Sequence, residues 1–197
     1  GSMTGCRSPL SLIAFSTAFG TSLALRLNEW LATNSAGADQ DWLEIYNPKT
    51  NAVVNLSGLV ISDKTSSVTT PAIIANSYID SGGFIRFWCD DTSSKGNHLA
   101  FKLSSTSGET VSIYAANRST VIDRVKFGAQ TVDVSMGRLP DGGTNLVYFV
   151  GADYMTPGGA NAYKTISTVI VNEVLAHTDP PFEDAIAHAD GRAAIAV

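Results

Sequence analysis

The sequence is poor in charge and in the residues that favour helices. Only 16% of its 197 residues are charged, and Glu and Lys together number 11, whereas Ser and Thr number 39 and Val and Ile number 28. Glu and Lys are good helix formers, while β-branched residues favour strands. This composition argues against a helical bundle or a coiled coil and predicts an all-β protein.

Positive charge is also scarce. The 13 Lys and Arg residues are scattered along the chain and are outnumbered by 18 Asp and Glu, which gives a formal net charge of -5. Such a surface repels phosphate backbones, so we expect no nucleic-acid partner. The length allows one substantial core but not two ordinary ones.

Residues 1–24 have the pattern of an expression scar followed by an export signal. Gly1 and Ser2 precede Met3, Arg7 supplies a positive charge, residues 10–19 are mostly apolar, and Ser22-Leu23-Ala24 is a small-x-small cleavage pattern. The apolar stretch is too short for a permanent membrane span. We therefore expect a secreted or cell-surface bacterial protein that begins at Leu25 and has no transmembrane segment in its mature chain. A buried first strand or a disordered leader is the alternative interpretation.

Only two cysteines, Cys6 and Cys89, are present. Removal of the leader would leave Cys89 as the single thiol, so we expect no internal disulfide. Because Cys89 ends an apolar run and has no histidine near it in sequence, a buried, inert thiol is expected rather than a nucleophile.

Short apolar or alternating segments separated by turn residues run from Leu25 to about Phe149, a pattern typical of a β-sandwich or barrel. The clearest alternation places Leu99, Phe101 and Leu103 on one face, with a hairpin-length loop at 104–108 after them. Further turns are expected at 117–119 and 141–143. The predicted strands are 25–32, 41–47, 53–62, 83–89, 98–103, 109–116, 120–127 and 145–150.

A second, incomplete copy follows the first domain. After a linker-like stretch rich in Gly, Pro and polar residues, the sequence of Leu27–Ala32 (LNEWLA) returns at residues 171–176 as VNEVLA. We therefore divide the chain into residues 1–24, a domain at 25–161, and a linker with a truncated repeat at 162–197. An orphan strand at 167–177 predicts self-association, in which it adds to the sheet edge of a neighbour.

A succession of short motifs along the first domain resembles the bacterial branch of the lamin tail domain. The resemblance runs in order over about residues 25–161, and its fold implies an immunoglobulin-like β-sandwich. The motifs are LNE at 27–29, DWLEIYNP at 41–48, VNLSG at 54–58, ISD at 61–63, FKLS at 101–104 with Gly108-Glu109, VSMGRLPDG at 134–142 and TPG at 156–158.

The resemblance implies an interaction platform rather than an enzyme, since the family has no established catalytic residues to transfer. Bacterial relatives occur as modules of large exported or surface proteins, often beside hydrolases. We therefore expect a non-enzymatic, exported interaction or adhesion module that binds a protein or a cell-surface partner. An accessory carbohydrate- or substrate-targeting module of a secreted hydrolase is the alternative, and a surface polysaccharide is then the partner.

The sequence itself offers no catalytic centre. His98, His177 and His188 lack the spacing of metal ligands, and no nucleophile or phosphate-binding motif is present. Strand alternation places Glu29 and Asp123 each on the same face as apolar neighbours. This predicts buried carboxylates that accept hydrogen bonds from backbone N–H groups. A glycosidase pair is the alternative.

Two sets of residues are candidate ligand-binding sites. Trp42, Glu44 and Tyr46 alternate on one strand face and could form a stacking platform for sugar rings if they were exposed. Asp90 and Asp91 open an acidic loop that could bind calcium, although solvated loops are the simpler interpretation and we expect no resident cofactor.

Overall fold

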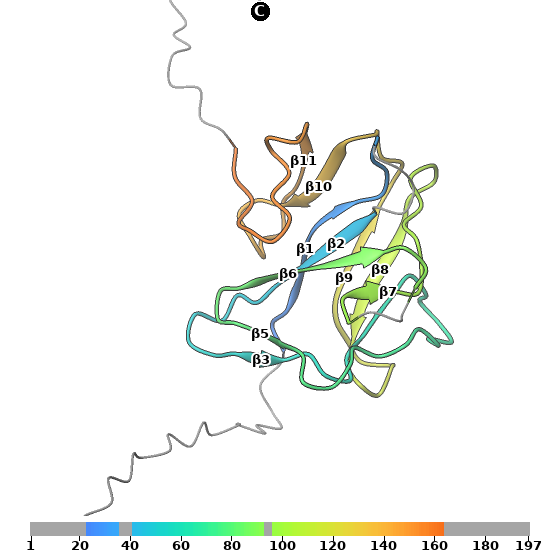
Figure 1. Cartoon of the computed structure of the whole chain (residues 1–197), viewed down its shortest axis with the longest axis vertical. Helices are drawn as coiled ribbons and strands as arrows, with labels where there is room; N and C mark the ends of the chain where they lie inside the picture. Colours follow the sequence, from blue (N-terminus) through green and yellow to red (C-terminus); the bar gives the residue numbers. More distant parts are fainter. Residues whose placement is uncertain (1–22, 36–40, 93–95, 164–197) are drawn as a thin grey trace, which may run out of the picture. The chain divides into compact units, whose positions relative to one another are not determined.

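The computed structural model describes residues 23–35, 41–92 and 96–163, and these residues are all-β, with no helix among them (Figure 1). By chain contacts the protein divides into two units, Gly1–Ala162 and Tyr163–Val197, and the fold below is that of the first. Its strands are β1 (Arg26–Leu31), β2 (Trp42–Tyr46), β3 (Val54–Asn55), β4 (Val60–Ser62), β5 (Tyr78–Ile79), β6 (Phe84–Cys89), β7 (His98–Leu99), β8 (Glu109–Tyr114), β9 (Val121–Phe127), β10 (Val134–Arg138) and β11 (Leu146–Val150).

The strands form two facing layers. One is a six-stranded sheet in the order β11-β10-β1-β2-β6-β7, and the other has three strands in the order β4-β8-β9. β3 and β5 pair separately, at the lower end of the view in Figure 1. The prediction of an all-β protein is confirmed, and the two packed sheets agree with a β-sandwich.

The core lies between the two sheets. Trp30 on β1 contacts Phe127 on β9 with ring centroids 5.6 Å apart, so Trp30 points toward the smaller sheet. Its cross-strand partner Leu43 and the next partner Phe87 are also buried. We call this side of the six-stranded sheet the core face and the opposite side the outer face.

Most predicted strands are found, with two exceptions in extent. The predicted strand 53–62 is wrong as one piece, because the chain turns at Gly58, whose φ of 83° belongs to the left-handed region that glycine tolerates best. The predicted strand 98–103 pairs with a neighbouring strand only at 98–99. Leu99, Phe101 and Leu103 are nevertheless each about 5% exposed. Their alternation therefore correctly predicted that these side chains are buried, but not how far the strand pairing extends.

The predicted hairpin at 104–108 is also wrong. β7 pairs in parallel with β6, whereas β8 pairs with β4 and β9, so the loop joins strands of different sheets. The other two predicted turns are confirmed. Residues 117–119 connect the antiparallel strands β8 and β9, and residues 141–143 connect β10 and β11.

β5 and β10 were not among the predicted strands. The β10 sequence VSMGR contains a glycine, a serine and an arginine, and only one β-branched residue. The glycine is needed for packing, because a Cβ atom on Gly137 would lie 2.7 Å from the carbonyl oxygen of Asn28 and 2.8 Å from Nδ2 of Asn161.

Candidate functional site

The most unusual polar feature of the fold is a pair of carboxylates on the outer face of the six-stranded sheet. Glu29 on β1 is the direct cross-strand partner of Glu44 on β2, and neither has exposed surface. Residues 151–161, which we call the covering segment, hydrogen-bond to both. The covering segment therefore closes this face over two acidic side chains.

Glu29 is held by donors from two directions. Its Oε1 accepts a 2.5 Å hydrogen bond from the Ser135 hydroxyl on β10, and its Oε2 accepts bonds from the backbone N–H of Thr156 at 3.2 Å and from the Thr156 hydroxyl at 3.0 Å. Burial raises the pKa of Glu29 above its usual range, and these three bonds oppose that rise. The prediction that Glu29 is buried and accepts a loop backbone N–H is confirmed.

Glu44 is held in the same way by the neighbouring part of the covering segment. Its Oε2 accepts a 2.5 Å bond from the backbone N–H of Gly158, and its Oε1 accepts a 3.1 Å bond from Nδ2 of Asn28. The pKa of Glu44 is raised to about 7, mainly by burial; the nearby Glu29 and Asp141 charges add to this rise, and the two bonds oppose it.

Two amides connect this pair to the β10–β11 turn. Asn28 donates from Nδ2 to Asp141 at 2.9 Å and accepts at Oδ1 from the backbone N–H of Gly142 at 3.0 Å. Asn161 donates from its backbone N–H to Asp141 at 3.0 Å and from Nδ2 to the Arg138 carbonyl at 2.9 Å. The Asn28 amide is matched on both its donor and its acceptor side, and the Asn161 amide donates to two backbone carbonyl oxygens, so both hold the covering segment against β1 and the β10–β11 turn.

Asp123 anchors a second polar cluster on β9. Its Oδ2 accepts the backbone N–H of Leu27 at 2.8 Å and lies 3.2 Å from the Arg138 guanidinium, while Arg26 approaches its Oδ1 at 3.7 Å. Arg138 also donates to the carbonyl oxygens of Leu27 and Gly143. The prediction of a hydrogen-bonded Asp123 is confirmed, and its position ties β9 to β1 and β10.

These carboxylates are arranged to join strands and loops. A substrate could reach Glu29 or Glu44 only if the covering segment moved, because both side chains are fully buried. Their oxygens already accept bonds from the protein. The geometry therefore supports a structural role for the pair.

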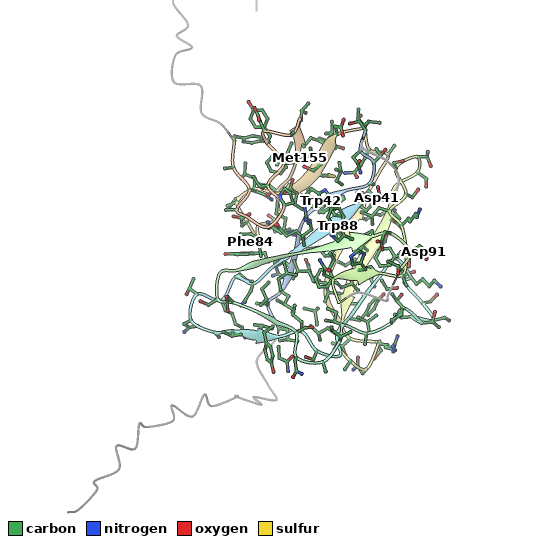
Figure 2. All side chains as sticks on the ribbon, in the orientation of Figure 1. Asp41, Trp42, Phe84, Trp88, Asp91 and Met155 are labelled. Atoms are coloured by element: carbon green, nitrogen blue, oxygen red, sulfur yellow. The ribbon has the colours of Figure 1, made fainter. Side chains whose placement is uncertain are left out.

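The outer face carries a second feature on β2 and β6, beside the buried pair. Tyr46 and Phe84 are direct cross-strand partners whose rings stack at a centroid distance of 4.6 Å and an angle of 21°. Arg86 and Trp88 follow Phe84 at two-residue intervals along β6. The guanidinium of Arg86 lies over the Trp88 ring, 4.2 Å from the ring centroid. All four side chains are half-buried (Figure 2 labels Phe84 and Trp88). We call Tyr46, Phe84, Arg86 and Trp88 the aromatic strip.

The predicted platform of Trp42, Glu44 and Tyr46 does not form as an exposed surface. Trp42 is 4% exposed and Glu44 is fully buried, and only Tyr46 reaches solvent as part of the aromatic strip. The sequence pattern located the correct strand face but could not show that residues from 151 onward cover it. Phe84 and Arg86 were missed, although their alternation with Trp88 along one predicted strand was visible.

In the acidic loop, the Asp90 side chain is hydrogen-bonded within the protein, whereas Asp91 is exposed. Asp90 bonds to Nδ1 of His98 at 2.5 Å and accepts the backbone N–H of Thr92, while Asp91 is exposed with a φ of 61°. Among the residues that the structure describes, no group of three or more His, Cys, Asp or Glu side chains could hold a metal ion. His177 and His188 lie outside the described residues.

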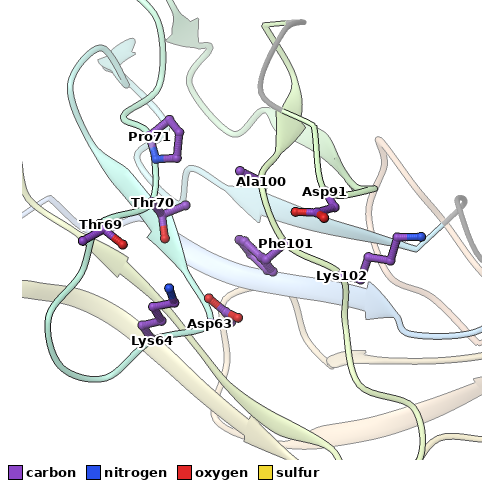
Figure 3. Close-up of a pocket in the computed structure, with 9 residues that line it drawn as sticks. All are labelled: Asp63, Lys64, Thr69, Thr70, Pro71, Asp91, Ala100, Phe101 and Lys102. Carbon is purple, nitrogen blue, oxygen red and sulfur yellow. The ribbon is translucent and has the colours of Figure 1, made fainter.

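Asp91 also borders a shallow hollow of about 560 Å³. Asp63 and Lys64 lie on one side of it and Asp91 and Lys102 on the other, with Phe101 between them (Figure 3). Thr69, Thr70, Pro71 and Ala100 complete its wall. The charges of opposite sign and the wide opening give the hollow no clear ligand class.

Cys89 fits the expectation of an inert thiol. It is fully buried, and burial raises its pKa well above the ordinary value, with further increases from nearby carboxylates. In the described part of the chain no helix has the length and hydropathy needed to cross a membrane. The expected leader, apart from Leu23 and Ala24, and the expected repeat at 167–177 lie outside the described residues.

Comparisons of the chain with protein-family models, with curated proteins and with solved structures find no match. The resemblance to lamin tail domains therefore depends on the sequence motifs alone.

Proposed function

We propose that the chain is a non-enzymatic, exported interaction module of lamin-tail type, with an immunoglobulin-like sandwich, that binds a protein on a bacterial cell surface. The observation that carries this proposal is the aromatic strip on the outer face. It combines three partly exposed aromatic rings with an arginine on a rigid sheet, and aromatic and arginine side chains dominate binding energy at protein interfaces.

The buried polar groups support this proposal indirectly. They hold the scaffold together, so the aromatic strip is the more suitable surface for binding a partner. Glu29 and Glu44 are occupied in fixing the covering segment, so the most perturbed carboxylates serve the scaffold. Side chains that protrude from central strands of a hydrogen-bonded sheet lose little freedom on binding. The sheet therefore acts as a support for recognition by the strip.

The carbohydrate-targeting alternative is favoured by one observation, the stacked pair of Tyr46 and Phe84, because sugar rings bind against flat aromatic faces. Against it, Trp30, Trp42 and Tyr114 are all buried. The exposed face of Trp88 is partly occupied by Arg86. The strip is thus better suited to a mixed polar and apolar protein surface than to a row of sugar rings.

The test compares the labelled full chain with the double variant Phe84→Ala/Trp88→Ala for binding to intact and protease-treated bacterial cells and to a polysaccharide array. Tyr78→Ala is the matched control, since Tyr78 is 40% exposed on β5, outside the strip. We expect binding to intact cells that the double variant and the protease treatment abolish and that Tyr78→Ala retains.

Polysaccharide binding that is lost in the double variant would instead establish the carbohydrate alternative. An absence of cell binding, or binding that the double variant retains, would contradict the proposed role of the strip. Repeating each arm with calcium and with a chelator tests the acidic loop at Asp90 and Asp91.

A further inference from the structure

The core face of the six-stranded sheet loses its cover toward β11. In one cross-strand row, Leu43, Trp30, Met136 and Tyr148 follow one another over β2, β1, β10 and β11. Leu43 and Trp30 are buried and Met136 is half-buried, but Tyr148 keeps 54% of its surface exposed. All four side chains lie on the face that forms the core. The edge of this face is therefore open.

The smaller sheet explains the opening, because its last strand, β9, reaches only as far as β1 and the C-terminal end of β10, at Arg138. Phe127 on β9 packs on Trp30, and Asp123 on β9 contacts Leu27 and Arg138. Among the described strands β9 pairs with β8 alone, so its other edge has no partner strand. β10 and β11 lie at the upper end of the view, above β8 and β9 (Figure 1).

The uncovered surface is apolar, and we call it the ledge. The cross-strand pairs Val134–Val150 and Met136–Tyr148 place four of its side chains on one face, and Val132 precedes them. Val132 is 50% exposed and Val150 is 65% exposed. An apolar sheet surface beside an unpaired strand edge is a favourable place for another strand to add.

The chain contains a segment with the chemistry to fill this place. Residues 167–177, STVIVNEVLAH, include the β-branched run from Thr168 to Val171, which favours an extended strand. Residues 171–176 repeat the sequence Leu27–Ala32, and β1 forms from residues 26–31 of that region. We call residues 167–177 the repeat segment.

We propose that the repeat segment of a second copy of the chain lies on the ledge as an extended strand and pairs with the free edge of β9. Alternate apolar side chains such as Val169 and Val171 would then pack on Met136, Tyr148 and Val150. This addition completes the smaller sheet over the two uncovered strands.

A second copy is the favoured source of the strand because of where the domain ends. Asn161 is fixed by bonds to the carbonyl oxygens of Asn28 and Arg138, beside the covering segment that closes the outer face. The ledge lies on the opposite, core face. A segment from the same chain would have to pass around the β11 edge, whereas a segment from another molecule can approach the ledge directly.

The test is sedimentation velocity of the full chain over concentrations from low micromolar to several hundred micromolar. We expect a monomer–dimer equilibrium in which Val150→Asp and, separately, Val169→Asp each weaken association by about tenfold or more, because each places a charge in an apolar contact. Val53→Asp is the matched control, since Val53 is 58% exposed and lies before β3. It should leave the equilibrium unchanged.

A lysine-reactive cross-linker applied to a mixture of isotopically light and heavy chains identifies the partner. Lys126 is exposed on β9, and Lys164 lies three residues before the repeat segment. Cross-links between light and heavy chains at these lysines are expected. A chain that stays monomeric, a dimer insensitive to both charged variants, or cross-links confined to chains of one label would each overturn the proposal.

Val169→Asp keeps the test decisive if Val150→Asp fails to fold, because residue 169 lies outside the described residues. The ledge and the aromatic strip share no residue. Loss of cell binding in the strip variants and loss of dimerisation in the ledge variants are therefore separate results.

Discussion

Glu29 and Glu44 face each other across β1 and β2, and both carboxyl groups are buried against the covering segment. Hydrogen bonds from Ser135, Thr156 and Gly158 compensate part of the cost of burial. Part of the cost remains, because the pKa of each carboxyl is raised by burial. This balance makes the stability of the domain depend on pH.

The stability of the domain should fall as the pH rises from about 4.5 to about 7. The pKa of Glu44 is raised from 4.5 to about 7 by burial, so in this range the folded state holds a proton that the unfolded state has released. The effect is on the order of 3 kcal/mol, since each pKa unit corresponds to about 1.4 kcal/mol. Chemical denaturation at a series of pH values measures the slope.

Glu44→Gln should flatten this slope, because it removes the titrating group at nearly constant shape. Asp91→Asn, which changes an exposed carboxyl, is the matched control and should retain the wild-type slope. Equal slopes in wild type and Glu44→Gln would show that Glu44 does not titrate in this range. A smaller slope should remain in Glu44→Gln, since the raised pKa of Glu29 acts in the same direction.

Glu29→Gln should lower the free energy of unfolding by about 1–3 kcal/mol near pH 4–5 and by less as the pH rises, because the variant lacks the ionisation cost that the raised pKa of Glu29 imposes on the wild type. The substitution replaces one acceptor oxygen with an amide donor that must face Ser135 or Thr156, which leaves a buried donor unmatched. Thermal and denaturant unfolding from about pH 4 to 8 measure the change. Unchanged stability over the whole range would contradict the structural role of Glu29.

Gly137→Ala should loosen the covering segment. The added Cβ would lie 2.7 Å from the Asn28 carbonyl oxygen and 2.8 Å from Nδ2 of Asn161, so one of these groups must move. We expect a loss of about 1–3 kcal/mol, which is typical of overpacking, and faster proteolysis within the covering segment. Gly128→Ala is the control because its Cβ meets no atom within 4 Å. Equal stability of the two variants would show that Asn161 packs loosely.

Arg138→Met should destabilise the domain much more than Arg26→Met. Both arginines approach Asp123, but the Arg138 side chain is 10% exposed and lies 3.2 Å away, whereas that of Arg26 is 37% exposed and lies 3.7 Å away. Loss of one partner of a buried pair costs about 3–5 kcal/mol, compared with about 0–1 kcal/mol at the surface. Comparable losses in the two variants, measured by denaturant unfolding, would contradict this ranking.

Cys89 should react with a thiol reagent only after the domain unfolds. Its sulfur is fully buried and burial raises its pKa, so both access and thiolate formation are disfavoured. The rate is measured in a Cys6→Ser variant, in which Cys89 is the single thiol. Rapid labelling under native conditions would show that β6 opens readily near its end.

Most strands could be predicted from the sequence because their own residues carry the apolar pattern of a buried strand. Alternating or continuous apolar residues identified β1, β2, β6, β8, β9 and β11, because strand formation and burial impose the same pattern on the chain. Turn residues located the β8–β9 and β10–β11 connections. β10 was missed because Ser135 and Gly137 interrupt its apolar pattern. Ser135 donates a hydrogen bond to Glu29, and Gly137 leaves room for Asn28 and Asn161.

The site depended on contacts between distant parts of the chain. The sequence itself determined that Glu29 is buried and hydrogen-bonded, since a carboxylate among apolar neighbours on a strand requires donors. Only the tertiary structure decided that Glu44 and Trp42 are buried too, and the Gly158 N–H that covers the Glu44 carboxyl comes from more than a hundred positions later in the chain. The alternation of a strand separates its two faces, but it does not say which face another segment will cover. For the same reason, the exposed strip on β6 and the open ledge on β11 became visible only when the two sheets were placed together, since the width of each sheet is set by pairing between distant strands.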